Sequence, residues 1–201
     1  YYFYLYSLYS PEILKIANES IARNISQLPK TIDSVLPSIH QPVHVHGHQS
    51  WIHESQTLIP MIRHHHTQGK SIAILCRNCT TNGPLYFYES ECAKHNIPCD
   101  LLERYRDHRN FMSHERITLC TIHKSKGLEW DVVFIVGCSD SHFPSMDKDV
   151  TDSSHNYLAK LEEERRLFYV ATTRAKTHLF FSFTRNSSNL SSAISHNQVA
   201  M

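Results

Sequence analysis

Short apolar runs alternate along this chain with segments in which apolar residues recur at helical spacing. Such runs are typical of buried strands, and strands are predicted at 71–76, 97–102, 117–122, 131–137 and 178–184. A connector with three prolines at 27–50 contains at most a short further strand at 43–45. Helices are predicted to begin at Ser10, which can cap a helix before Pro11, and to cover 54–66, 85–95 and 158–174. Pro60 falls inside the second helix, where proline is unfavourable.

The order of these elements indicates the fold class. Strands separated by helices favour a parallel sheet covered by helices on both faces, so an α/β fold is predicted. With 201 residues, of which 41% are hydrophobic, the chain is long enough for one domain with a substantial core. Six cysteines without a signal peptide favour reduced thiols and an intracellular location. No apolar run is long enough to cross a bilayer, so no membrane contact is expected.

Composition excludes little else. The net charge is +1, so any contact with nucleic acid has to be local and helped by hydrogen bonds and stacking. Cys76, Cys79, Cys92 and Cys99 can be drawn as a zinc site, although Cys76 lies in a predicted buried strand. The histidines at 44, 46, 48 and 64–66 are expected at the surface, with adventitious binding of a transition metal as the alternative. No metal site is predicted.

Two motifs carry more chemistry. The first is Thr121-Ile-His-Lys-Ser-Lys-Gly-Leu-Glu129, and the second is Glu162-Glu-Glu-Arg-Arg-Leu-Phe-Tyr-Val-Ala-Thr-Thr-Arg-Ala-Lys176. On its own, the charged start of the second motif is typical of a solvated helix face with charge pairs along it. Together, in this order and spacing, the two motifs resemble the last two signature motifs of the UvrD/Rep family of superfamily 1 DNA helicases. The segments 72–78 and 96–99 resemble further strands of that family.

The resemblance implies the second motor domain of such a helicase. It has a RecA-like parallel sheet flanked by helices, and the whole motor moves 3′ to 5′ on single-stranded DNA. By this reading, residues 1–9 are the join to an N-terminal domain, 10–185 are the helicase C-terminal domain and 186–201 are a flexible tail. The first residue is Tyr, so the chain is expected either to be cut from something longer or to begin in a mistranslated or decayed reading frame. ATP and Mg²⁺ are expected to be held mainly by an N-terminal RecA-like domain, present in cis or in trans.

The resemblance also assigns roles to residues. It makes Arg174 the catalytic arginine finger that reaches the γ-phosphate of ATP. It places Glu129 at the ribose hydroxyl, with Gly127 allowing a tight turn, and Arg77 in the nucleotide site. The resemblance also implies that Thr121, His123 and Lys126 face single-stranded DNA. Without the resemblance, His123 is more simply a histidine satisfied at a strand end, and Lys124 and Lys126 either touch phosphates or are solvated.

Departures from the family pattern leave a rival interpretation open. Leu8 stands where the family has a second arginine that contacts the γ-phosphate, which puts hydrolysis in doubt. Only 100–116 stand where the family usually inserts a large accessory subdomain. Gly69-Lys70-Ser71 precedes a predicted strand, so it is not a phosphate loop. The rival is a non-catalytic remnant that binds single-stranded DNA or a protein partner.

Overall fold

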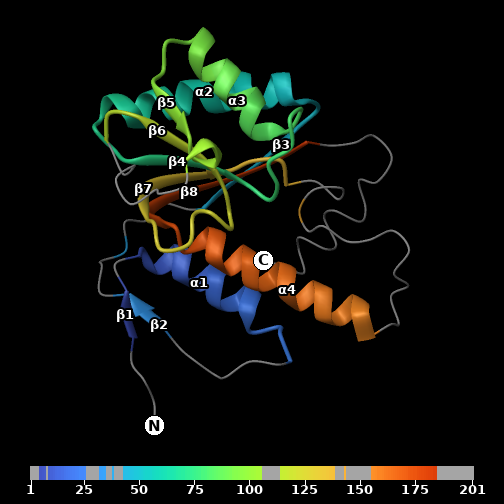
Figure 1. Ribbon diagram of the computed structural model, residues 1–201. Coiled ribbons are helices and arrows are strands. Elements are labelled where there is room, and N and C mark those ends of the chain that lie inside the picture. Colours follow the sequence, from blue (N-terminus) through green and yellow to red (C-terminus); the bar gives the residue numbers. More distant parts are fainter. Residues whose placement is uncertain are drawn as a thin grey trace.

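Six parallel strands form the central sheet of this protein, seen here in a computed structural model (Figure 1). The structure describes residues 5–7, 9–25, 32–34, 38, 43–105, 114–138, 143 and 155–184. The sheet has the order β3-β8-β7-β4-β6-β5, and every neighbouring pair is parallel. Its strands are β3 (His44–His48), β4 (Ile72–Cys76), β5 (Cys99–Leu101), β6 (Ile117–Thr121), β7 (Trp130–Ile135) and β8 (Ala175–Thr184). The predicted α/β fold with a parallel sheet is confirmed.

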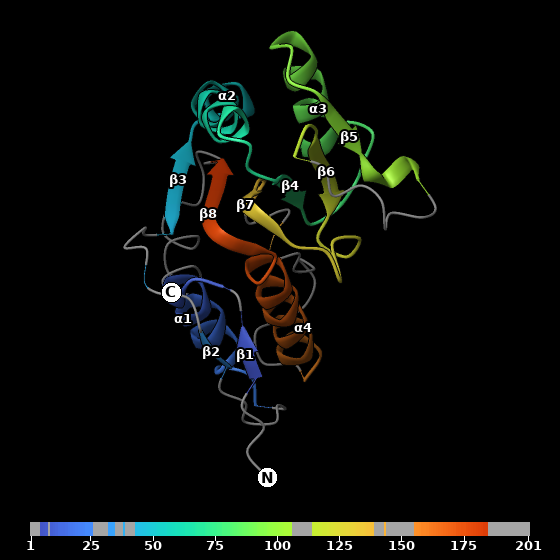
Figure 2. The same cartoon turned by 90° about the vertical axis from the view of Figure 1, so that its left-hand side faces the viewer.

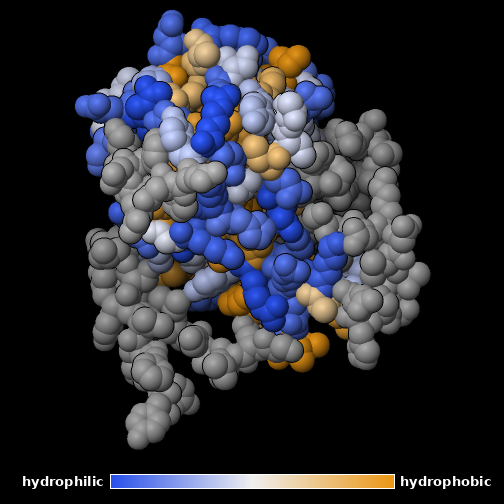
Figure 3. Space-filling view, in the orientation of Figure 1, coloured by the Kyte–Doolittle hydropathy of each residue, from blue (hydrophilic) through white to orange (hydrophobic). Residues whose placement is uncertain are grey.

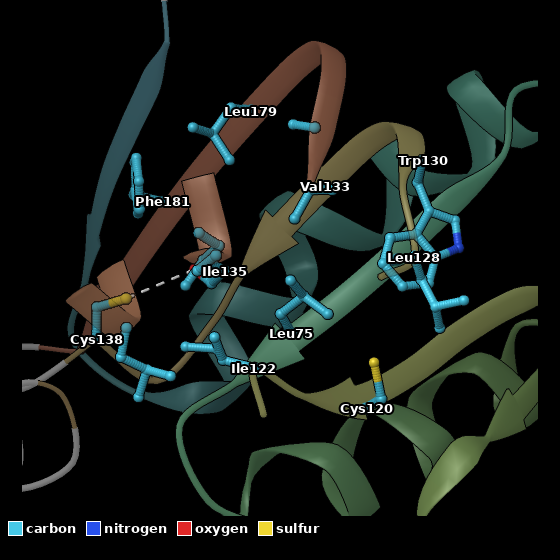
Figure 4. Packing of buried hydrophobic residues seen from close by; sticks show 14 of the residues in the cluster. Leu75, Cys120, Ile122, Leu128, Trp130, Val133, Ile135, Cys138, Leu179 and Phe181 are labelled. Carbon is cyan, nitrogen blue, oxygen red and sulfur yellow. Dashed lines mark hydrogen bonds between the residues drawn. The ribbon is translucent and has the colours of Figure 1, made fainter. Parts of the chain in front are cut away.

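Helices cover both faces of this sheet. On one face lie α1 (Pro11–Ile21) and α4 (His155–Thr172), and on the other lie α2 (Trp51–Thr67) and α3 (Pro84–Lys94) (Figure 2). Alternation along β4 explains why both faces are apolar, because successive side chains point to opposite sides of a sheet. Ala73 and Leu75 join the cluster that includes residues of α1 and α4 (Figure 4), whereas Ile72 and Ile74 join the cluster under α2 and α3.

Helix α1 begins as its sequence predicts. Ser10 is the N-cap, its Oγ accepts a hydrogen bond from the Ile13 backbone N–H at 3.4 Å, and Pro11 occupies the first turn. The backbone N–H of Ser10 donates to the Lys176 carbonyl at 2.9 Å, which attaches the start of α1 to β8. A small separate sheet of β1 (Leu5–Ser7) and β2 (Ile32–Ser34) lies beside α1.

Several predicted boundaries were wrong. Helix α2 begins at Trp51, three residues early, because Ser50 caps it by accepting from the His53 N–H at 3.3 Å. Pro60 lies inside α2 without ending it. Proline has no N–H to donate to the backbone carbonyl one turn earlier, but Pro60 is exposed, so water can bind that carbonyl instead. Residues 102–104 form a short 3-10 helix, η1, instead of continuing β5, and β2 in the connector was not predicted.

The end of α4 also differs from its prediction. The helix ends at Thr172 instead of residue 174, and β8 begins at Ala175, where it pairs with Trp130 at the start of β7. Arg174 therefore lies in the short link between helix and strand. This link brings the second motif directly to the point where the first motif enters the sheet.

The crossover from β6 to β7 contains no helix. Both strands are neighbours of β4, so residues 122–129, which we call the crossover, carry the chain across β4 from the carboxyl end of β6 to the amino end of β7. Ile122 donates its N–H to the Cys76 carbonyl at 2.9 Å, and Leu128 is buried in the core. Gly127 has a φ of +82°, which confirms the tight turn expected there.

Candidate functional site

The crossover connects two groups of polar side chains at opposite ends of the sheet. Because β6 and β7 are parallel, a chain that leaves the carboxyl end of one and enters the amino end of the other must run the length of a strand. The amino-end cluster consists of Tyr9, Glu129, Tyr169 and Arg174. The carboxyl-end cluster consists of Arg77, Thr121, His123, Lys126 and Glu164. All seven site residues predicted from the sequence lie in these clusters or in the crossover between them.

Arg174 joins the end of α4 to the crossover. Its Nη1 donates to the Leu128 carbonyl at 2.8 Å, its Nε to the Val170 carbonyl at 3.0 Å, and its Nη2 to Thr173 Oγ1 at 3.3 Å. Its own carbonyl accepts from the Trp130 N–H at 2.8 Å. A guanidinium has five N–H groups, so three bonds hold the side chain in place and leave N–H groups for a further acceptor.

Glu129 is held by a residue that sequence reasoning did not select. The Tyr9 hydroxyl donates to Glu129 Oε1. Burial, and then this hydrogen bond, raise the pKa of Tyr9, so the phenol stays a donor at physiological pH. Among the described residues, Glu129 Oε2 has no hydrogen-bond partner, and it remains available to a hydroxyl. Leu8, at the expected arginine position, lies outside the described residues.

Arg77 forms a buried ion pair with α4. Its Nη2 lies 2.8 Å from Glu164 Oε1, its Nε donates to both oxygens of that carboxylate at 3.1 and 3.3 Å, and its Nη1 donates to Asn78 Oδ1. The Arg77 side chain is 17% exposed and that of Glu164 is 3% exposed. This bidentate geometry fixes the carboxyl end of β4 against the middle of α4.

The two clusters are separate in space, and Arg77 belongs to the carboxyl-end one. Glu164 and Thr172 lie eight residues apart on α4, a rise of about 12 Å, and Arg174 comes after Thr172. No hydrogen bond or ion pair between described residues joins Arg77 to Glu129 or Arg174. Its expected role in the nucleotide site stays a prediction, and its position is beside His123.

His123 and Lys126 are exposed on the crossover. Partial burial, and then the nearby cations Arg77 and Lys126, lower the pKa of His123 below its ordinary value. The imidazole is therefore neutral at pH 7, a form that can stack or share one hydrogen bond. The Lys126 side chain has no described partner, so its charge is available to an anion.

Lys124 faces inward instead. Its Nζ donates to the carbonyls of Leu102 at 2.6 Å and Tyr105 at 2.9 Å and lies 3.7 Å from Glu103 Oε2. Glu103 Oε1 in turn accepts from the Thr121 N–H at 2.9 Å, and Thr121 Oγ1 accepts from the Lys124 N–H at 3.3 Å. From the sequence, Lys124 was expected either to contact phosphate or to be solvated. In the structure it does neither, because its ammonium group binds carbonyls and a carboxylate of the same chain.

The candidate metal ligands do not gather into a site. All six cysteines are free thiols, and no group of three or more metal-binding side chains occurs within the described ranges. The expectation that 64–66 are surface histidines was wrong for His65, which is 8% exposed with its ring 4.9 Å from that of His178 and 5.7 Å from Phe180. Burial lowers the pKa of His65 to about 4. The helical pattern did not reveal this packing, because β8 and β3 meet α2 only in the fold.

The other described parts of the chain carry none of the seven predicted site residues. In Figure 3 the described surface on this side is mostly hydrophilic, with apolar residues scattered over it. Gly69-Lys70-Ser71 leads directly into β4, as predicted, and Ser71 donates to Asp131 from its N–H at 2.9 Å and from its Oγ at 2.8 Å. Among the described helices, none is both long enough and apolar enough to cross a membrane.

Comparison with known proteins agrees with both motifs. Residues 104–186 match the family model of the UvrD-like helicase C-terminal domain. The chain is 39% identical over 84 residues to the ATP-dependent DNA helicase Rep of Buchnera aphidicola, a match that covers 42% of this chain and 12% of that protein. It is 40% identical over 83 residues to the ATP-dependent DNA helicase PcrA of Staphylococcus epidermidis, covering 38% and 11%. The chain thus spans about a tenth of the length of these relatives.

A solved structure shares the fold. The C-terminal domain of a possible DNA helicase from Lactobacillus plantarum superposes with a TM-score of 0.55 and covers 90% of each chain, at 14% sequence identity. This likeness extends over almost the whole chain, including parts outside the matched family segment. It agrees with the RecA-like arrangement of the sheet and its helices.

Proposed function

We propose, from the premise that residues 104–186 belong to the UvrD-like helicase C-terminal domain family, that this chain is the C-terminal motor domain of an ATP-dependent 3′-5′ DNA helicase or translocase. Such a motor uses ATP at a cleft between two RecA-like domains. The present chain supplies one wall of that cleft and part of a track for single-stranded DNA. The other wall, which holds ATP and Mg²⁺, belongs to an N-terminal RecA-like domain in cis or in trans.

The amino-end cluster suits one side of a nucleotide. ATP, when bound, supplies a γ-phosphate whose oxygens gain charge during transfer, and this charge needs a cation. Arg174 fits that need, because its remaining N–H groups can donate to an anion while three bonds hold the side chain. Glu129 Oε2 fits a ribose hydroxyl, because its partner oxygen is already fixed by Tyr9. Arginine finger and ribose contact are therefore the roles we assign to these two residues.

The carboxyl-end cluster suits a single DNA strand. A neutral His123 can stack on a base or donate one hydrogen bond to a phosphate, and Lys126 can approach a phosphate as a cation. Thr121 lies at the strand end beside them. The crossover joins this cluster to Glu129 without a helix between them, so movement at one end displaces the other.

A single observation carries the proposal. The second motif meets the first through the bonds from Trp130 to the Arg174 carbonyl and from Arg174 to the Leu128 carbonyl, at 2.8 Å each. Arg174 is thereby bonded to the two residues that flank Glu129, so a cation and a carboxylate from distant parts of the sequence belong to the same junction. This pair supports a nucleotide-facing role better than a purely structural one, which needs no carboxylate at that position.

The test is Arg174→Ala in the ATPase-competent motor that combines this chain with its N-terminal domain. Turnover should fall by roughly 10³ or more while nucleotide affinity changes little, as for a group that acts on the transition state. Arg166→Ala is the matched control, because Arg166 lies on α4, the helix that leads to Arg174, and pairs with Glu162 at 3.0 Å on the exposed side. Equal turnover in the two variants would remove Arg174 from the finger role.

A second candidate function is a non-catalytic module that binds single-stranded DNA or a protein. The observation that favours it is Leu8 at the expected arginine position. In that case Arg174 serves only to attach α4 to the crossover. Arg174→Ala would then lower the free energy of unfolding and leave any turnover of the assembled protein unchanged.

A further inference from the structure

Lys124 and Glu103 form a clamp between η1 (Leu102–Arg104) and the start of the crossover. We infer that these two are positioning residues for the DNA-facing side chains: they touch no DNA themselves and hold the crossover in the shape that binds it. This inference rests on the proposed DNA contact of His123 and Lys126, and it extends that contact to residues that no motif assigns.

The clamp consists of polar contacts made by the Glu103 carboxylate and the Lys124 ammonium group. Glu103 accepts from the Thr121 N–H through Oε1 at 2.9 Å, while its Oε2 lies 3.7 Å from Lys124 Nζ. Lys124 donates at 2.6 Å to the carbonyl of Leu102, the first residue of η1, and at 2.9 Å to that of Tyr105, which follows η1. The end of β6 is therefore attached to η1 through the Thr121 N–H, and the crossover is attached to it through its first lysine.

Burial separates Lys124 from its neighbour Lys126. The Lys124 side chain is 21% exposed and that of Glu103 is 22% exposed, whereas Lys126 is exposed and has no described partner. An ammonium that already donates to two carbonyls and faces a carboxylate gains little from a phosphate. Hydrogen bonds from a charged group are also stronger than neutral ones, so this lysine holds its position firmly.

His123 directly precedes Lys124 in the chain, and its place depends on the clamp. The N–H of Lys126 donates to the His123 carbonyl at 3.4 Å, and that of Lys124 donates to Thr121 Oγ1 at 3.3 Å. Both bonds belong to the turn that the clamp closes from one side. Loss of the clamp should therefore let the His123 ring leave the position in which it meets DNA, without loss of any charge that DNA contacts.

The two lysines give a matched test, because Lys124→Met and Lys126→Met remove the same charge. The full chain would be titrated against fluorescein-labelled oligo(dT) by fluorescence anisotropy at several NaCl concentrations. Lys126→Met should lower the slope of log affinity against log salt by about 0.7, the value for one phosphate contact on a single strand. Lys124→Met should weaken binding about tenfold with the salt slope unchanged, and Lys124→Arg should restore most of the affinity.

A double-mutant cycle separates positioning from general stability. In a His123→Ala background, Lys124→Met should lose most of its effect, because it acts through His123. Glu103→Ala should reproduce Lys124→Met, and it serves as the second variant if Lys124→Met does not fold. Melting temperatures of all variants identify any that unfold at the assay temperature.

The possible outcomes distinguish failure of the proposed DNA site from failure of the clamp. If the wild-type chain does not bind oligo(dT), or if His123→Ala and Lys126→Met bind it as wild type does, the proposed DNA site is wrong and the clamp loses its role. If those variants weaken binding while folded Lys124→Met and Glu103→Ala do not, only the clamp is refuted. A reduced salt slope in Lys124→Met would show that this lysine contacts phosphate directly, which also overturns the inference.

Discussion

Replacing Arg77 by Met should destabilise the domain far more than replacing Arg166 by Met, although both arginines pair with a glutamate of α4. Arg77 and Glu164 are 17% and 3% exposed, and the pair has three N–H to carboxylate contacts between 2.8 and 3.3 Å. Removing one partner of such a pair costs about 3–5 kcal/mol, because the other charge stays buried. Arg166 is 49% exposed and bonds Glu162 at 3.0 Å, so its loss costs about 0–1 kcal/mol.

Urea unfolding of the chain, followed by tryptophan fluorescence and circular dichroism at pH 7, measures both values. A domain of this size has a total free energy of unfolding of about 5–15 kcal/mol, so the Arg77→Met loss is a large part of it.

The reasoning fails if Arg77→Met costs no more than Arg166→Met at pH 7. Glu164→Gln provides an independent check. It leaves no buried charge on α4, so it should cost less than Arg77→Met although it breaks the same pair.

Further predictions concern both clusters and the histidines. His123→Ala in the assembled motor should reduce DNA stimulation of ATPase more than basal hydrolysis, by the equivalent of about 1–3 kcal/mol in DNA binding, and unchanged stimulation would end its DNA-facing assignment. Because the pKa of His65 is lowered to about 4, the folded state binds fewer protons than the unfolded chain between pH 4 and 6.5, so its contribution is complete above pH 6.5 and is lost as the pH falls through this window. His65→Phe should therefore flatten the acid side of a stability curve measured by thermal unfolding, and a curve like the wild type's would contradict this. Tyr9→Phe should lower the free energy of unfolding by about 1.5–3 kcal/mol because it removes a bond to a carboxylate, while Tyr169→Phe, which has no described bond to that carboxylate, should have a smaller effect.

Much of the fold could be predicted because most helices and strands depend on residues that are close together in the sequence. The runs at 71–76, 117–122 and 131–137 became β4, β6 and β7 with small shifts, since apolar periodicity depends on near neighbours in the chain. The start of α2 depends on a local cap at Ser50, but other boundaries that were wrong depend on partners outside the segment. β8 starts at Ala175 because Trp130 pairs with it there, and no pattern within 175–178 indicates that partner.

The candidate site divides in the same way. Both motifs are continuous stretches, so the family resemblance that they carry was enough to select Arg174, Glu129 and residues 121–129. Only the tertiary structure paired Tyr9 with Glu129 across 120 positions, Arg77 with Glu164 across 87, and Lys124 with the Leu102 carbonyl across 22.

The physical reason is that the sequence determines which residues are apolar, capped or turn-forming, whereas the strand order determines which polar side chains meet. In the order β3-β8-β7-β4-β6-β5, β4 lies between β6 and β7, so the crossover passes over it and reaches both ends of the sheet. A buried charge such as Glu164 is stable only if that order brings a cation to it. The sequence near each element thus determined whether it forms a helix or a strand, whereas packing determined which polar side chains meet.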